Sequence, residues 1–258
     1  GDDRQWLLVK KPDAWAGDTW PEESVLSGLT LEELRDGSKR AEKLAAELEK
    51  LGAKKRVVKP EPMLAETAEK PPTGKGWIFE LKYDGFRLLA SKKGLFYRSG
   101  REATKLYPEI VRAVRALPYD SLLLDGEICV LDPKGLPEFQ RLQQRGKLTR
   151  AIDIERASVE SPVVCYVFDI LEAEGYDLRP LPLIERKRLL KMVLPPKGFL
   201  RYSDHVEARG EEFFRAVTEK GLEGVLAKRA DSPYKPGRSA AWLKVKADLT
   251  GDFVIVGF

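Results

Sequence analysis

The sequence predicts an α+β fold in which antiparallel sheets are flanked by helices. Three apolar segments, 77–82, 86–91 and 94–98, follow one another closely, and "ASKKGLFY" joins the last two through a short turn typical of a hairpin. The predicted helices fall irregularly along the chain, which argues against a doubly wound parallel sheet. With 258 residues, 43% of them hydrophobic and 33% charged, the chain can bury one sizeable core under a charged surface.

The first predicted element is a helix. Residues 1–29 have little periodicity and many breakers, and we interpret them as a tail or the remnant of an upstream domain, because the chain begins with Gly rather than Met. Thr30 and Glu33 have the spacing of a capping box. The apolar spacing from Ala41 to Leu51 then predicts one amphipathic helix.

A linker and the main body follow. The segment 53–62 combines two prolines with Lys54, Lys55 and Arg56, which are either a solvated helix end or phosphate contacts. From Met63 onward, strands are mixed with helices. The predicted strands are 77–82, 86–91, 94–98, 122–131, 163–171, 222–229, 241–246 and 252–258. The predicted helices are 107–117, 137–145, 183–193 and 209–220.

Composition excludes several classes of protein. No apolar run approaches the roughly 20 residues of a membrane-spanning helix, and no signal peptide is recognisable, so we expect a cytoplasmic protein. Cys129 and Cys165 lack zinc or disulfide spacing and are expected to be reduced thiols in strands, and His205 fits no metal cluster or triad. The net charge of +4 permits a polyanionic partner without requiring one.

The stretch "WIFELKYDGFR" (77–87) places a lysine, Lys82, at the end of a strand. Lysine is a poor nucleophile while protonated, and it becomes a good one when desolvated or placed among other cations. A rigid strand end would hold Lys82 still, and Asp84-Gly85 would form a tight turn where a bulky ligand can approach the backbone. The alternative is an edge-strand lysine paired with Asp84.

Carboxylates in apolar surroundings are a second signal. "LLLDGEICV" puts Asp125 and Glu127 within an apolar strand, where a buried carboxylate is costly unless it binds a partner such as a sugar hydroxyl or a metal. "LEGVLAKR" places Glu223 directly before another strand. "VVCYVFDIL" offers Phe168, which is either a base-stacking aromatic or a plain core residue.

Two lysines complete the pattern. "AWLKVKAD" alternates Trp242, Lys244 and Lys246 on one face of a strand, where the two cations repel each other unless an anion lies between them. Exposed lysines on an edge strand are the alternative. Two carboxylates, two lysines and a candidate nucleophile together describe a nucleotide phosphate site.

The order of these motifs is specific. "KYDGFR" (82–87), "DGE" (125–127), "YVFD" (166–169), "EGV" (223–225) and "KVK" (244–246) resemble the collinear motifs of covalent nucleotidyltransferases, specifically ATP-dependent DNA ligases. Supporting stretches resemble the ligase domain of bacterial multidomain end-joining ligases; they are "PMLAE" (62–66), "RSGRE" (98–102), "LRPLPLIERKRLL" (178–190) and "SPYKPGRSAAWLKVK" (232–246).

The resemblance also implies a domain organisation. It covers 63–258 and implies a covalent nucleotidyltransferase (ATP-grasp-like) adenylation domain at 63–250, preceded by the helix and basic linker at 30–62. "QWLLVKKPDAWA" (5–16) resembles the close of a 3′-phosphoesterase domain. "GDFVIVGF" (251–258) resembles the first strand of an OB-type domain that is otherwise largely absent.

The resemblance implies a role for each matching residue. Lys82 would attack the α-phosphorus of ATP and hold AMP through a phosphoramidate bond. Glu80 with its neighbouring backbone would read the adenine edge, Phe168 would stack on the ring, and Arg87 would contact the ribose with Glu127. The implied catalytic set is Lys82, Asp84, Arg87, Lys244 and Lys246, the last two neutralising the α-phosphate. The implied nucleotide-binding set is Glu80, Leu81, Lys82, Arg87, Arg101, Glu127, Phe168, Glu223, Lys244 and Lys246. The implied ligands of Mg²⁺ or Mn²⁺ are Glu127 and Glu223.

The implied function is that of an ATP-dependent DNA ligase in repair and end joining, which passes AMP to a DNA 5′-phosphate so that a 3′-hydroxyl seals the break. The expected partners are nicked or broken duplex DNA, a Ku-like end-binding protein, and polymerase or phosphoesterase domains of the same chain. A monomer in the bacterial cytoplasm, associated with the nucleoid, is expected. RNA ligases and capping-type guanylyltransferases share the lysine motif and are the alternatives, together with a non-catalytic nucleic-acid-binding module. A module without catalysis would have no physical reason to keep two carboxylates within apolar strands.

Overall fold

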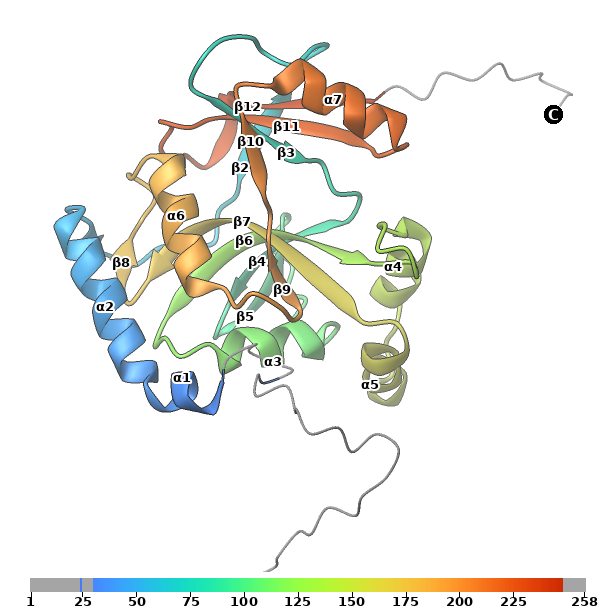
Figure 1. Cartoon of the computed structure of the whole chain (residues 1–258). Helices are drawn as coiled ribbons and strands as arrows, with labels where there is room; N and C mark the ends of the chain where they lie inside the picture. Colours follow the sequence, from blue (N-terminus) through green and yellow to red (C-terminus); the bar gives the residue numbers. More distant parts are fainter. Residues whose placement is uncertain (1–23, 25–29, 248–258) are drawn as a thin grey trace, which may run out of the picture.

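The computed structural model describes residue 24 and residues 30–247, and its strands form two sheets that pack face to face (Figure 1). The strands of the larger sheet are β1 (Lys54–Lys55), β4 (Phe86–Ser91), β5 (Gly94–Tyr97), β6 (Leu122–Val130), β7 (Val163–Ala173), β8 (Tyr176–Asp177) and β9 (Leu200–Tyr202). The strands of the smaller sheet are β2 (Met63–Thr67), β3 (Trp77–Leu81), β10 (His205–Glu207), β11 (Gly224–Arg229) and β12 (Gly237–Lys246).

The order of the strands determines which of them are interior. The larger sheet runs β1-β8-β7-β6-β4-β5, with β9 paired to β7, and the smaller sheet runs β10-β3-β11-β12-β2. Neighbours are antiparallel except for the pairs β12 with β2 and β7 with β9, which are parallel. The strands β3 and β12 are therefore both interior strands, and the predicted α+β class is confirmed.

Helices cover the outer faces of both sheets. They are α1 (Leu31–Arg35), α2 (Gly37–Lys50), α3 (Pro108–Ala116), α4 (Phe139–Gly146), α5 (Ala151–Glu160), α6 (Leu183–Val193) and α7 (Gly210–Glu219). In Figure 1, α7 lies against the smaller sheet, and α3 lies beneath the larger one. In the part of the chain that the structure describes, no helix is both long and apolar enough to cross a membrane.

The apolar core is divided by the sheets. The largest cluster packs α2, α3 and α6 against the outer face of the larger sheet, and a small cluster packs α7 on the smaller sheet through Val217, Val225 and Val245. A third cluster lies between the sheets and includes Phe168 and Trp242. Because side chains alternate along a strand, each sheet turns its other face toward this inter-sheet space.

Most predicted elements are confirmed within two residues. The predicted hairpin is present, with Ser91 paired to Gly94, and both cysteines are free and buried. The helix α5 and the strands β2, β8, β9 and β10 were missed. The predicted strand 252–258, the side chain of Glu33 and all of the opening region except residue 24 lie outside the described residues.

Two local predictions were wrong. The single helix predicted up to Leu51 is divided at Asp36, where Gly37 approaches Pro118 so closely that a Cβ atom would lie 2.8 Å from the Pro118 Cβ. The predicted linker contains a strand, because Lys54 and Lys55 pair with Asp177 and Tyr176 of β8. Backbone pairing with a distant strand is invisible to a local reading of charge and proline content.

Candidate active site

Lys82 directly follows β3, between the two sheets. Its backbone N–H donates to the Gly224 carbonyl at 2.9 Å, and its Nζ donates to Oε1 of Glu223. The neighbouring Tyr83 stacks on Tyr166 of β7, with ring centroids 3.9 Å apart. The lysine is thus held at the end of an interior strand and paired with Glu223, which rules out the alternative of an edge-strand lysine paired with Asp84.

Two glycines bring the backbones around Lys82 close together. A Cβ atom on Gly85 would lie 2.2 Å from the Ile128 carbonyl oxygen of β6, and one on Gly224 would lie 2.2 Å from the Val245 carbonyl oxygen of β12. Gly224 also has a φ of 143°, a conformation that L side chains rarely adopt. The turn after Lys82 therefore needs glycine because β6 approaches it, whereas the sequence interpretation attributed this glycine to a ligand.

The negative charges of the carboxyl groups near Lys82 are only partly balanced by cations and hydrogen bonds. Burial raises the pKa of Glu127 to about 8, although Arg87 and Lys82 act to lower it. Burial, and then the charge of Glu223, also raise the pKa of Asp84. The Oε2 atom of Glu223 is buried and has no hydrogen-bond partner within the described residues.

These carboxyl groups suit a divalent cation. No cluster of three or more His, Cys, Asp or Glu side chains with metal-site spacing occurs in the described part of the chain. Glu127 nevertheless has a pKa that burial raises, and Glu223 has one oxygen, Oε2, without a hydrogen-bond partner in the described residues, although its Oε1 accepts from Lys82. Mg²⁺ commonly takes one or two carboxylates and completes its shell with water and substrate phosphates, so the residues fit such an ion.

Lys244 and Lys246 lie on the inter-sheet face of β12. Lys244 is opposite Leu226, which is opposite Glu80 of β3, and Lys246 is opposite Gly224, which contacts Lys82. Directly opposed residues of antiparallel strands point to the same face, so the two lysines and Lys82 share one face. The edge-strand alternative is excluded, because β12 lies between β11 and β2.

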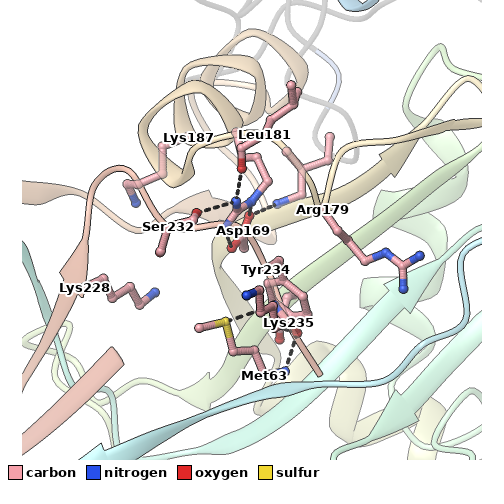
Figure 2. Close-up of polar contacts among 12 residues, drawn as sticks. Met63, Asp169, Arg179, Leu181, Lys187, Lys228, Ser232, Tyr234 and Lys235 are labelled. Carbon is pink, nitrogen blue, oxygen red and sulfur yellow. Dashed lines mark hydrogen bonds and ion pairs between the residues drawn. The ribbon is translucent and has the colours of Figure 1, made fainter. Parts of the chain in front are cut away.

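Arg87 and Asp125 form a bidentate pair. The Nε and Nη2 atoms of Arg87 donate to Asp125 at 2.9 and 2.6 Å, and the Tyr234 hydroxyl donates to Asp125 Oδ2 at 2.6 Å. The same hydroxyl accepts from the Met63 N–H at 2.9 Å (Figure 2). The partners of the fully buried Asp125 are thus side chains of the protein, which corrects the expectation of a sugar hydroxyl or a metal.

Phe168 is a core residue of the inter-sheet space, with 4% of its surface exposed. It lies at a register shift, since Asp169 is opposite Asp125 while Val167 is opposite Gly126. Such a bulge leaves Phe168 unpaired and turns its side chain toward the other sheet. Its ring meets Trp242 edge-on at 5.9 Å, and the Nζ of Lys228 lies 4.1 Å from its centroid.

Glu80 is also buried, with 1% of its surface exposed. Lys187 of α6 donates to its Oε1 at 2.6 Å, and Lys228 of β11 donates to its Oε2 at 2.7 Å. Neither lysine was predicted as a site residue. The available signal was a lysine within the buried face of a helix and another within an apolar strand.

Figure 2 shows the polar network beside this cluster. Arg186 of α6 is fully buried and binds both oxygens of Asp169, at 2.8 and 2.9 Å. It also donates to the carbonyl oxygens of Leu181 and Ser232. The network joins α6 to β7 and to the segment that carries Tyr234.

An open pocket of about 800 Å³ adjoins Gly85 in the turn after β3. Arg87 and Glu127 line it together with three further cationic side chains, namely Arg98, Arg101 and Lys147. The guanidinium of Arg101 lies 4.8 Å from the Tyr97 ring centroid. The pocket places a basic surface beside Glu127, where an anionic group can approach.

Comparisons with known proteins agree with these motifs. The family model described as "ATP dependent DNA ligase domain" matches residues 62–246. The chain is 34% identical to the "Multifunctional non-homologous end joining protein LigD" of Pseudomonas aeruginosa over 274 residues, covering 100% of this chain and 31% of the relative. It is 40% identical to a "Probable DNA ligase" of Beutenbergia cavernae over 209 residues, covering 76% of this chain and 40% of the relative.

A solved ligase structure is similar in fold to this chain. The "mycobacterial DNA ligase D complexed with ATP and MES" superposes with a TM-score of 0.59 and 33% identity, covering 72% of this chain and 60% of that one. The chain spans less than half the length of the two curated relatives.

Proposed function

Because this chain belongs to the ATP-dependent DNA ligase domain family, we propose that it is the adenylating core of a DNA ligase acting in DNA repair and end joining. Lys82 attacks the α-phosphorus of ATP, pyrophosphate leaves, and AMP stays on Nζ through a phosphoramidate bond. The AMP then passes to the 5′-phosphate of a DNA break, and a 3′-hydroxyl displaces it. The observation that carries the proposal is Lys82 at a rigid strand end, in contact with Glu223 and beside two cations on the same face.

The chain's own residues supply position and charge. Phosphoryl transfer needs little covalent help beyond alignment and stabilisation of the charge that develops. Glu223 Oε1, which accepts a hydrogen bond from Lys82 Nζ, is placed to take the proton that the amine must lose before attack. Lys244 and Lys246 would neutralise the α-phosphate, and Asp84 lies near enough to Glu223 and Lys82 for their charges to act on its pKa.

The nucleotide would occupy the inter-sheet face of β3, β11 and β12. Glu80 and the adjoining backbone at Leu81 would meet the base, with Leu226 in the same row of the sheet. Arg87, fixed by Asp125, and Glu127 would contact the ribose. Phe168 would serve as the stacking surface while Lys228 stays bound to Glu80, and Arg101 would reach the site from the basic pocket.

Glu127 and Glu223 would hold Mg²⁺ or Mn²⁺. Such an ion supplies positive charge to the phosphate oxygens when bound. The protein contributes the buried, unpartnered Oε2 of Glu223 and the carboxyl of Glu127, whose pKa of about 8 marks a site short of positive charge.

Nicked or broken duplex DNA is the proposed substrate. The basic side chains lining the pocket beside Glu127 suit a DNA phosphate, because protein contacts to the DNA backbone are chiefly made by Arg and Lys. The Pseudomonas relative is described as a multifunctional non-homologous end joining protein, which supports end joining. Polymerase or phosphoesterase domains in the same chain and a Ku-like partner are further proposals, which rest on the resemblance of the motifs. A monomer in the bacterial cytoplasm, near the nucleoid, suits such a role.

Intact-mass measurement tests the proposal directly. Purified protein incubated with ATP and Mg²⁺ should gain the mass of one AMP, and pyrophosphate should remove it. GTP in place of ATP should give no comparable adduct, which separates the ligase from a capping-type guanylyltransferase. A chain that never gains AMP under these conditions would contradict the proposed function.

A further inference from the structure

The inter-sheet space holds one carboxylate that is bound by two lysines from different elements. Lys187 Nζ donates to Glu80 Oε1 at 2.6 Å and also to the Ser203 carbonyl at 2.8 Å. Lys228 Nζ donates to Glu80 Oε2 at 2.7 Å and lies 4.1 and 4.3 Å from the ring centroids of Phe168 and Trp242. Each ammonium group is therefore held by contacts other than Glu80, and the carboxylate is fixed from both sides.

The charge of this group is unusual for a buried site. Two lysines and one carboxylate, each no more than 1% exposed, leave an excess of positive charge. Burial acts to raise the pKa of Glu80, but the two lysines outweigh it and hold the pKa below its usual range. Burial lowers the pKa of Lys228, against the charges of Glu80 and Asp169, and Asp169 is itself paired with Arg186. Further titratable groups near Glu80 are His205 of the adjacent β10, Tyr83 and Tyr202.

A carboxylate in this state can only accept hydrogen bonds. It has about four acceptor positions, and the lysines occupy one on each oxygen. A purine with an amino group at C6 offers a donor to the remaining positions, whereas a purine with a carbonyl at C6 presents an acceptor there. Opposing two acceptors in a buried site leaves both without a proton to share, which is strongly unfavourable.

We infer that Lys187 and Lys228 are specificity-determining positioning residues, which keep Glu80 a fixed, acceptor-only group so that the site takes 6-aminopurine and rejects 6-oxopurine nucleotides. The inference rests on the proposed function, in which Glu80 meets the base. It adds that the selection depends on two lysines that need not touch the nucleotide. Their place in the sequence, far from Glu80, gives no hint of this role.

Three nucleotides separate the contact between Glu80 and the purine C6 substituent from all other contacts. ATP and ITP differ only at the C6 substituent and its adjacent N1 proton, and the triphosphate of purine riboside has neither a donor nor an acceptor at C6. The measurement is the initial rate of lysyl-nucleotide formation with each nucleotide, expressed as a ratio to ATP, from pH 6 to 8.5. The ratio cancels the deprotonation of Lys82 and every other step that all three nucleotides share.

In the wild type, ITP should react on the order of a hundredfold or more slowly than ATP, with a ratio that does not depend on pH. In Lys187→Met or Lys228→Met, only one lysine opposes the burial that raises the pKa of Glu80. Glu80 therefore takes up a proton at higher pH and can then donate a hydrogen bond to a carbonyl oxygen. The ITP penalty should therefore shrink at least tenfold, and shrink further as the pH falls. The purine riboside ratio should change much less.

Three further variants make the outcome specific. Lys191→Met removes an exposed lysine one turn further along α6, and it should keep the wild-type ratio at every pH, as should Lys187→Arg, which keeps the cation. Because the charge of Lys187 lowers the pKa of His205, Lys187→Met also shifts the titration of His205. Lys228→Met retains Lys187, so a pH-dependent ITP ratio in both variants is assigned to Glu80. Glu80→Gln should abolish the ITP penalty, since an amide can donate as well as accept.

Wild-type ratios in Lys187→Met and Lys228→Met at every pH would overturn the inference while leaving the proposed function intact. If Lys187→Met or Lys228→Met fails to fold in a thermal melt, the test rests on Lys187→Arg and Glu80→Gln. A wild-type ratio of ITP to ATP rates in Glu80→Gln would then overturn the inference. Absence of labelling by ATP in the wild-type chain would instead contradict the proposed function itself.

Discussion

Two groups of charged side chains lie between the sheets, and they differ in how completely they are paired. Around Lys82, the Oε2 of Glu223 has no partner within the described residues, and burial raises the pKa of Glu127. Deeper in the same space, Asp169 and Asp125 each accept a bidentate arginine, and Glu80 accepts two lysines. We call the first group the open cluster and the second the closed cluster.

The difference indicates that the two clusters have different roles. Buried polar networks whose members are all satisfied make the surrounding structure rigid and unique, whereas partly satisfied groups are held at a cost in stability. The closed cluster ties α6, β7, β3 and β11 together at fixed positions. The open cluster retains the carboxylate oxygens that the proposed cation would require, so function and stability should respond to different substitutions.

The largest expected effect comes from the open cluster. Lys82→Arg should abolish labelling by α-phosphate-tagged ATP, because a guanidinium does not deprotonate at accessible pH. The melting temperature should change little, since a cation of similar length still faces Glu223. Lys93→Arg, at the exposed hairpin turn, is the matched control and should label normally. Normal labelling of folded Lys82→Arg would remove Lys82 from its role.

The next largest effect comes from the closed cluster and appears in stability. Arg186→Met leaves the fully buried Asp169 without its cation, which should cost about 3–5 kcal/mol of unfolding free energy. Arg188→Met, on the exposed side of the same helix, breaks surface pairs worth about 0–1 kcal/mol and is the control. Equal denaturation midpoints for the two variants would show that the closed cluster does not stabilise the fold.

A substitution in the open cluster should alter metal dependence. Glu223→Gln keeps the size of the side chain and removes its charge, so half-maximal labelling should require roughly 10- to 100-fold more Mg²⁺. Unfolding by denaturant should be nearly unchanged. A Mg²⁺ titration that coincides with that of the parent would exclude Glu223 as a ligand.

Phe168 packs against Arg87 and Lys228 of the closed cluster, and it is also the proposed stacking surface for the base, so its substitution tests both roles. Phe168→Leu preserves most of the apolar volume, so its cost in stability should stay below about 1.5 kcal/mol. The loss of the stacking surface should weaken ATP use by about 1–3 kcal/mol, read as the change in rate at limiting ATP. If stability falls and ATP use does not, Phe168 is a core residue alone.

The smallest effect is a dependence of stability on pH. Burial, followed by the positive charge of Lys187, lowers the pKa of His205. The folded protein then binds fewer protons than the unfolded chain, so this contribution is present above the unfolded pKa near 6.5 and is lost as the pH falls through the folded value. In His205→Asn, the decline in melting temperature between pH 7.5 and 5.5 should be shallower. An identical decline would exclude His205 as the titrating group.

The open cluster was the more predictable of the two, because its signals are local. Lys82 and Glu223 each stand at a strand end, and Lys244 and Lys246 alternate along one strand, so pattern and motif were enough to name them. Glu80 was named from the resemblance, but its partners were not, since Lys187 and Lys228 lie 107 and 148 positions away. Only the packing of α6 and β11 on β3 brings them together.

Register was the second obstacle to prediction. The bulge that turns Phe168 into the inter-sheet space depends on how β6 and β7 pair, which period-2 alternation within one strand does not reveal. The partners of Asp125 were not predicted either. Arg87 comes from the neighbouring strand β4, and Tyr234 comes from a segment without regular structure. The fold class itself needed only the succession of strands and helices, and it was predicted correctly.

The parallel pairing of β2 with β12 has a consequence for how the protein is made. The Met63 N–H binds the Tyr234 hydroxyl across 171 positions of sequence, and β2 finds its place only beside β12. On a ribosome, the larger sheet can assemble as soon as β9 has emerged, while β2 and β3 wait for the last strands of the smaller sheet. Contacts this distant in sequence are slow to form, since the long loop must close first. The inter-sheet surface beside Lys82 is therefore the last part of the described fold to be completed, and a nascent chain acquires the proposed site only when the larger sheet is already built.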